Sequence, residues 1–225
     1  MRPIVLLHGA LGSDRQVERL KTELEQKFKV FTLCFEGHGS RNSERPLRIE
    51  HFSENLRDFL EENNLVKPIV FGYSMGGYVA IYTEAMFPNS FEKIITLGTK
   101  FSWTPGIAAR EVRMLQPEII EEKVPKFAAH LDQMHAPNDW KAIMNATAEM
   151  MENMGENPSL DDVELSQIVC PVVLMLGGKD NMVSHAETDA IKTKIPNAEF
   201  HSFENFEHPM EKVDLSVLGG FICDM

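Results

Sequence analysis

The stretch of the chain that most constrains its fold is the run from Ile69 to Ala80. It begins with apolar, β-branched residues typical of a buried strand, reaches Gly72, and continues after Gly76 as a helix-forming segment. Between the two glycines lies Ser74, at the centre of a G-x-S-x-G pattern. With a strand before it and a helix after it, this pattern places the serine at the tip of a sharp, strained turn above the sheet. The pattern therefore predicts a nucleophilic serine.

A serine hydroxyl becomes an effective nucleophile only beside a histidine base, which in turn needs a carboxylate to orient it. When the serine lies in a sharp turn of this kind between a strand and a helix, the acid follows it in the chain and the histidine comes last. Asp180 comes shortly after an apolar, strand-like run, and His208 follows the next such run. We therefore predict that Ser74, Asp180 and His208 form a catalytic triad.

The other acids and histidines of this region fit the two positions less well. Asp161 and Asp162 come before the strand that the acid should follow. His201 lies inside a predicted strand, and His185 lies in the first turn of a predicted helix. Asp161 and Asp162 are therefore weaker candidates for the acid, and His201 is expected to have a structural or solvent-facing role. A carboxylate elsewhere, such as Asp161 or Glu204, is the alternative to Asp180.

Acyl transfer through a serine also needs N–H donors for the oxyanion of the tetrahedral intermediate. Met75 is the first residue of the helix after the serine, where backbone N–H groups have no partner inside the helix. We expect a second donor from the loop after the first predicted strand. Ala10 is the preferred residue there, and Leu11 is the alternative.

The chain resembles the α/β-hydrolases over nearly its whole length. The resemblance rests on motifs that occur in the order typical of that family: His8–Gly12, Glu36–Ser40, Gly72–Gly77, Gly177–Asp180 and Glu207–Pro209. It implies a serine hydrolase, because the relatives that remove halogens or open epoxides usually carry aspartate at the nucleophile position.

Alternating strand and helix patterns predict an α/β fold with a mostly parallel sheet of about six strands and helices on both faces. The first predicted strand, residues 3–8, begins so close to residue 1 that we expect the N-terminal hairpin of many family members to be missing. Residues 100–165 show helical periodicity, punctuated by prolines, and no clear strand. We expect them to form a helical cap inserted into a hydrolase core of residues 1–99 and 166–225.

Three further signals predict where helices begin. Ser13 followed by Gln16, and Ser184 followed by Glu187, have the spacing of a capping box, in which two side chains satisfy free N–H groups at a helix start. Pro209 suits the first position of a final helix, where its missing N–H costs nothing.

Both tryptophans, Trp103 and Trp140, lie in the predicted cap, together with six of the methionines. Most of these side chains are expected to pack the cap's own core. Methionine adapts its shape easily, so we expect a few of them to line an apolar acyl pocket. Trp103, Trp140 and Leu11 are the predicted substrate-binding residues.

A net charge of −12 predicts a surface that repels nucleic acid and anionic membranes. No apolar stretch is long enough to span a bilayer, and the short apolar run after Met1 does not fit a signal peptide. The three cysteines are odd in number and lack the spacing of a disulfide framework. We therefore expect a cytoplasmic protein without nucleic-acid or membrane partners.

Scattered histidines and cysteines lack metal-ligand spacing, and no glycine-rich dinucleotide motif follows a strand. We therefore expect no metal and no cofactor. The sequence carries no signal for an oligomeric state.

The expected function is hydrolysis of a small carboxylic ester or thioester through an acyl-enzyme. A C–C bond hydrolase, or a lyase like that of the menaquinone pathway, would use the same triad. Residues 100–160 contain more acidic than basic residues, whereas that lyase's polyanionic substrate calls for arginines over the site. A hydrolase-like receptor that binds a small molecule with little turnover is the third alternative.

Overall fold

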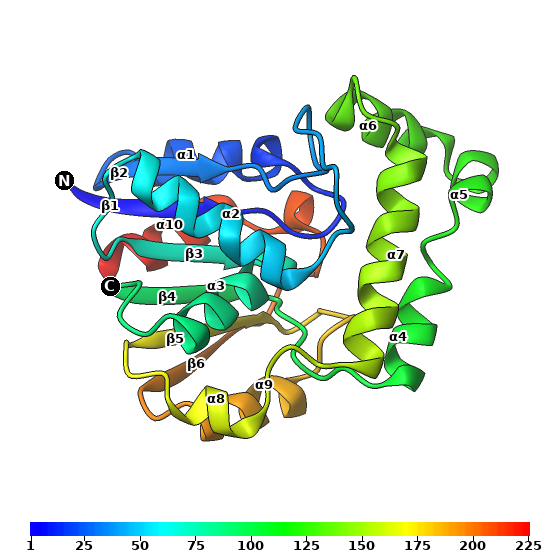
Figure 1. Cartoon of the computed structure of the whole chain (residues 1–225). Helices are drawn as coiled ribbons and strands as arrows, with labels where there is room; N and C mark the ends of the chain where they lie inside the picture. Colours follow the sequence, from blue (N-terminus) through cyan, green and yellow to red (C-terminus); the bar gives the residue numbers. More distant parts are fainter.

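The computed structural model describes all 225 residues. Six strands form one sheet in the order β2-β1-β3-β4-β5-β6, and every neighbouring pair is parallel (Figure 1). The strands are β1 Arg2–Leu7, β2 Phe28–Leu33, β3 Ile69–Tyr73, β4 Lys93–Leu97, β5 Val172–Gly177 and β6 Ala198–Phe203. The predicted parallel α/β sheet is confirmed.

Alternation along the strands sends side chains to two hydrophobic clusters, one on each face of the sheet. Val5 and Leu7 belong to the larger cluster, whereas Ile4 and Leu6 belong to the other. All four are fully buried. Such continuous apolar runs are typical of strands in parallel sheets, which are covered on both faces.

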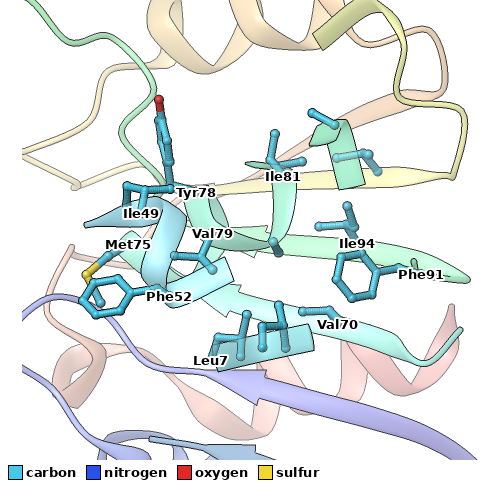
Figure 2. Close-up of a cluster of buried hydrophobic side chains, with 14 of the residues drawn as sticks. Leu7, Ile49, Phe52, Val70, Met75, Tyr78, Val79, Ile81, Phe91 and Ile94 are labelled. Atoms are coloured by element: carbon cyan, nitrogen blue, oxygen red, sulfur yellow. The ribbon is translucent and has the colours of Figure 1, made fainter. Parts of the chain in front are cut away.

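Six helices flank the sheet: α1 Glu18–Leu24, α2 Ile49–Glu62, α3 Met75–Met86, α8 Asp162–Ser166, α9 His185–Lys194 and α10 Leu215–Asp224. Helices α2, α3, α8 and α9 contribute to the larger cluster, and α1 and α10 contribute to the other. Figure 2 shows Leu7 and Val70 of the sheet in the larger cluster, together with Phe52 of α2 and Val79 of α3.

Between β4 and β5 the chain forms four more helices: α4 Pro105–Val112, α5 Pro117–Lys123, α6 Pro125–His135 and α7 Trp140–Glu156. We call these four the inserted helices. They lie beyond the carboxyl ends of the strands, at the right of Figure 1. The boundaries of a cap at residues 100 and 165 stay a prediction.

The register of the strands places the loops that carry the predicted site residues at one edge of the sheet. Gly72, near the end of β3, pairs with Leu7 of β1, and Gly177 at the end of β5 pairs with Phe203 of β6. Because neighbouring parallel strands end at the same level, the loops that follow them begin side by side. The loops after β1, β3, β5 and β6 therefore all begin on the side of the sheet that faces the inserted helices (Figure 1).

The final helix begins later than predicted. Pro209 has an extended backbone, with ψ 126°, and precedes a short 3-10 segment at Met210–Lys212. Helix α10 begins at Leu215, because the Asp214 carboxylate accepts hydrogen bonds from the N–H groups of Ser216 and Val217.

Neither predicted capping box is complete, because only the serine of each pair bonds to its own helix start. Ser13 and Ser184 do accept hydrogen bonds from backbone N–H groups at their helix starts. The Gln16 side chain, however, accepts from the Gly9 N–H at 3.0 Å. The Glu187 carboxylate accepts from the N–H groups of residues 101 and 102, each at 2.8 Å. Both side chains are therefore used to fix loops near the carboxyl edge of the sheet.

Candidate active site

Ser74 lies in the turn between β3 and α3, with φ 50° and ψ −115°. A positive φ is unfavourable for a residue with a side chain and persists only where neighbouring contacts hold it. The Ser74 N–H donates to the Leu97 carbonyl at 2.8 Å, and the Thr99 hydroxyl donates to the Ser74 carbonyl at 3.0 Å. The turn therefore has the strained geometry that the G-x-S-x-G pattern predicts.

The two glycines of the pattern allow strand and helix to approach closely. A Cβ atom on Gly72 would lie 2.4 Å from the carbonyl carbon of Gly76. A Cβ atom on Gly76 would lie 2.7 Å from the carbonyl oxygens of Leu7 and His8. Both contacts are too short for any side chain, so a substitution at either position would displace the turn that carries Ser74.

The His208 ring and the Asp180 carboxylate are hydrogen-bonded between Nδ1 and Oδ2 at 2.8 Å. Their side chains are 8% and 1% exposed. The other carboxylate oxygen, Oδ1, accepts from the backbone N–H groups of Met182 at 2.8 Å and Val183 at 2.9 Å. Because both oxygens are engaged, the carboxylate is fixed toward the ring.

Burial alone would raise the pKa of Asp180, but the hydrogen bond and the charge of His208 outweigh it. The N–H groups of Val183 and Met182 act in the same direction, so the pKa of Asp180 lies below its usual value. The carboxylate is therefore ionised at neutral pH and able to stabilise a positive charge on the ring.

The loops that carry Asp180 and His208 are also joined through the backbone. The Lys179 N–H donates to the Phe206 carbonyl at 3.0 Å. The Tyr73 hydroxyl donates to the carbonyl of His208 itself at 2.8 Å. Tyr73, the residue before the serine, thus connects the turn at the end of β3 to the histidine loop. Sequence reasoning did not identify this role, for which no local pattern gives a signal.

Gly98, directly after β4, is a second residue that sequence reasoning missed. Its φ is +62°, and a Cβ atom there would lie 3.2 Å from Asp180 Oδ2 and 3.3 Å from His208 Nδ1. Glycine adopts this backbone conformation without strain and leaves room for the two side chains. Its position at the end of a central strand was the one available signal.

Ser74 and His208 line the same pocket, which has about 50 Å³ of free space and a mostly apolar wall. The hydrogen bonds of the structure include the His208–Asp180 pair but none between Ser74 and His208. Such a bond is often long in the resting state and shortens in the reacting complex. Other lining residues are Ala10, Ile49, Met75, Tyr78, Lys100, Trp103, Glu111, Met150, Met151, Met154, Met182 and Val183.

The two predicted oxyanion donors, Met75 and Ala10, both border this pocket. Met75 is the first residue of α3, so its N–H lies at the positive end of the helix. Ala10 belongs to a tight turn in which the Gly12 N–H donates to the Gly9 carbonyl at 3.1 Å. Both residues therefore border the pocket that Ser74 also lines.

A buried charge cluster forms part of the pocket wall, which sequence reasoning did not anticipate. Lys100 Nζ donates to the Met182 carbonyl at 2.7 Å and lies 3.6 Å from the Glu111 carboxylate and 3.9 Å from that of Glu187. Lys100 and Glu111 both face the pocket. Their side chains are only 10% and 5% exposed. The apolar wall thus has one charged side.

The structure separates the two tryptophans. Trp103 borders the pocket. Trp140, only 6% exposed, packs instead with Ala128, Leu131 and Met144 of the inserted helices. Leu11 packs against the same cluster rather than lining the pocket. Substrate contacts from Trp140 and Leu11 stay a prediction, because neither residue is among those that line this pocket.

The alternative acids and histidines have other partners. Asp161 caps α8 by accepting from the N–H groups at its start, at 2.8 and 3.0 Å. His201 lies 3.3 Å from the Glu199 carboxylate, and His185 contacts the Ser202 hydroxyl. None of these side chains lines the pocket.

No group of three or more histidine, cysteine or acidic side chains is arranged to hold a metal ion. None of the helices is both long enough and apolar enough to cross a membrane.

Three comparisons with known proteins point to one fold family. The family model for the alpha/beta hydrolase fold matches residues 2–160. The sn-1-specific diacylglycerol lipase ABHD11 of Danio rerio is 22% identical, over 92% of this chain and 72% of its own. Lipase 1 of Psychrobacter immobilis is 24% identical, over 92% of this chain and 71% of its own.

Among solved structures, a thermophilic esterase from Thermogutta terrifontis superimposes with a TM-score of 0.80 at 19% identity. The match covers 100% of this chain and 89% of the esterase. An identity this low supports the fold alone, whereas the family model extends over most of the chain. The chain therefore belongs to the alpha/beta hydrolase fold family and is an enzyme of the hydrolase class.

Proposed function

We propose that the protein hydrolyses a small carboxylic ester or thioester through an acyl-enzyme. Ser74 is the nucleophile, His208 the general base and Asp180 the orienting acid in this proposal. The observation that supports it most is the 2.8 Å hydrogen bond from His208 Nδ1 to Asp180 Oδ2. His208 also borders the pocket that Ser74 lines, and Ser74 has a strained backbone. The names of the relatives, which are lipases and an esterase, support the ester class.

The reaction follows from the two nitrogens of the ring. Because Asp180 accepts the proton on Nδ1, Nε2 is free to take the proton of the Ser74 hydroxyl. The serine oxygen then attacks the carbonyl carbon, while Asp180 stabilises the imidazolium that forms. The backbone N–H groups of Met75 and Ala10 hold the oxyanion.

Collapse of this intermediate breaks the bond to the leaving alcohol or thiol, which takes the proton from His208. Water then enters, loses a proton to His208 and releases the acid from Ser74 by the same steps in reverse. No metal or cofactor is required for these steps.

The pocket supports a short, uncharged acyl group. About 50 Å³ of free space admits few heavy atoms, and most of the lining is apolar. Methionines of α7 that border it can move to admit slightly longer chains. In this proposal residues 100–165 form a helical cap on a core of residues 1–99 and 166–225, with Trp103 as a substrate contact.

The test combines a fluorophosphonate probe with a panel of nitrophenyl esters and acyl thioesters of increasing chain length. The probe is expected to label Ser74 in the wild type and to leave Ser74→Ala unlabelled, as peptide mapping by mass spectrometry would establish. Steady turnover is expected with acetyl and propionyl substrates.

The other outcomes separate the alternatives. Labelling of Ser74 without turnover of any ester or thioester would favour the small-molecule receptor or the cleavage of another bond. Labelling at a different serine would disprove the assignment of the nucleophile.

A further inference from the structure

The turn that carries Ala10 contains a second strained residue. Leu11 has φ +57° at the third position of the Gly9–Gly12 turn. Glycine or asparagine usually occupies that position, because a positive φ brings a side chain close to the backbone. A leucine therefore needs outside support to remain there, and the direction of the neighbouring Ala10 N–H depends on that support.

The support comes from the end of α6. His135 is fully buried. Its Nε2 lies 3.1 Å from the Leu11 carbonyl oxygen, and its Nδ1 lies 3.0 Å from the Gly39 nitrogen. A carbonyl can only accept and a backbone N–H can only donate, so the ring carries its proton on Nε2 and donates to Leu11.

Two other features agree with this arrangement. The Leu11 side chain packs against the cluster of Trp140, Leu131 and Met144, so the same inserted helices hold both its side chain and its carbonyl. Burial lowers the pKa of His135, although its hydrogen bond to Leu11 opposes that shift. The neutral ring needed for this pair of hydrogen bonds is therefore favoured at neutral pH.

We infer that His135 is a positioning residue of the oxyanion hole: its Nε2–H holds the Leu11 carbonyl and thereby directs the Ala10 N–H toward Ser74. The inference rests on the proposed hydrolase mechanism and extends it. The inserted helices then contribute to the chemistry by shaping an N–H donor of the core, in addition to bordering the pocket.

The inserted helices have a separate attachment to the core, which provides a control. The Asn138 side chain donates to the Gly39 carbonyl at 3.0 Å and to the Arg41 carbonyl at 3.2 Å. Neither bond involves the Gly9–Gly12 turn. Asn138→Ala therefore weakens the attachment of the helices without removing the support of Leu11.

Two substitutions divide the functions of the His135 ring. The amide of His135→Gln can occupy the place of Nε2 and donate to Leu11, whereas that of His135→Asn can occupy the place of Nδ1 and accept from Gly39. His135→Asn is expected to lower kcat by about 10- to 100-fold with little change in KM, as misplacement of one catalytic group does. His135→Gln and Asn138→Ala are expected to stay within a few fold of the wild type.

A trifluoromethyl ketone, whose bound form carries an oxyanion, should lose affinity for His135→Asn by about the same factor as kcat/KM. A purely structural role would instead lower the melting temperature of both His135 variants and leave kcat of the folded protein unchanged. Equal kcat in His135→Asn and the wild type would overturn the inference.

Residue-resolved hydrogen exchange tests the same inference without activity. His135→Asn should speed the exchange of the Gly12 amide, which closes the turn, and His135→Gln should speed that of the Gly39 amide. An unchanged Gly12 amide in His135→Asn would also overturn the inference. If the wild type neither hydrolyses esters nor labels at Ser74, the proposed function fails, and the exchange pattern alone decides whether His135 holds the turn.

Discussion

Asp180 uses both of its carboxylate oxygens, one for the ring of His208 and the other for two backbone N–H groups of its own loop. The two residues are 28 positions apart and follow different strands, β5 and β6. The N–H groups fix the carboxylate, and the carboxylate fixes the ring. The ring orientation that the proposed mechanism needs is therefore present before substrate binds.

Asp180→Asn should lower kcat by about 10⁴-fold, the effect of the same change in a serine-protease triad. The amide keeps the shape of the carboxylate but favours the wrong tautomer of His208 and no longer stabilises the imidazolium. Steady-state ester hydrolysis, with circular dichroism to verify folding, would measure this loss.

The matched control is Glu204→Gln, a neutralised acid on the exposed loop after β6, which should stay within a few fold of the wild type. If instead Asp180→Asn kept nearly full activity, another carboxylate would have to orient the ring.

Gly98→Ala should lower kcat by at least about tenfold, because displacing a catalytic group by a fraction of an ångström is costly. The added Cβ atom would press against Asp180 Oδ2 and His208 Nδ1, at a backbone angle that alanine disfavours. Ester kinetics and thermal unfolding should be measured together. A variant that lost stability but kept its kcat would argue against a role of Gly98 in spacing the pair.

Gly106→Ala is the control for that substitution. Gly106 lies in α4, and nothing lies within 4 Å of its Cβ position. The change should leave kcat unaltered and raise the free energy of unfolding by about 0.5–1 kcal/mol, because alanine favours the helix.

Met151→Ala should shift the enzyme toward longer acyl chains. Met151 is half-buried and borders the pocket, so a smaller side chain adds room beside Ser74. Relative kcat/KM should improve about fourfold for each methylene that the larger pocket admits, from about 0.8 kcal/mol per buried methylene. The measurement is a series of nitrophenyl esters from acetate to octanoate.

Met114→Ala changes an exposed methionine outside this pocket, so it should keep the chain-length profile of the wild type. An identical profile for Met151→Ala would mean that the acyl group does not bind against α7.

The parts of the site that the sequence could predict are those that depend on short sequence patterns. The glycines around Ser74 and the strands before Asp180 and His208 depend on neighbours along the chain, and parallel register then brings their loops together. The contact between His135 and Leu11 joins residues 124 positions apart and depends on how the inserted helices dock. Periodicity marks such residues as buried without naming their partners, and it does not tell which apolar residues of the inserted helices, such as Trp140, pack among themselves.

Unfolding measurements across pH should show that stability is lost as pH falls below about 6.5. Burial lowers the pKa of His8 to about 4 and holds the pKa of His38 well below its ordinary value. Between the low pKa of such a histidine in the folded chain and its ordinary value of about 6.5 in the unfolded chain, only the unfolded chain binds the proton. The free energy of unfolding should therefore rise by about 1.4 kcal/mol per pH unit for each such histidine, up to a plateau above pH 6.5.

His38→Asn tests this origin of the acid sensitivity. His38 is fully buried, its Nδ1 lies 3.1 Å from the Glu36 carbonyl, and its Nε2 has no partner. The side-chain amide of asparagine can donate in place of Nδ1 but binds no proton. The slope of the free energy of unfolding between pH 5 and 6.5 should therefore fall by the contribution of one histidine, about 1.4 kcal/mol per pH unit. His130→Asn, at an exposed histidine, should leave the slope unchanged. Urea unfolding at several pH values measures these slopes, and equal slopes in the wild type and His38→Asn would show that His38 does not contribute.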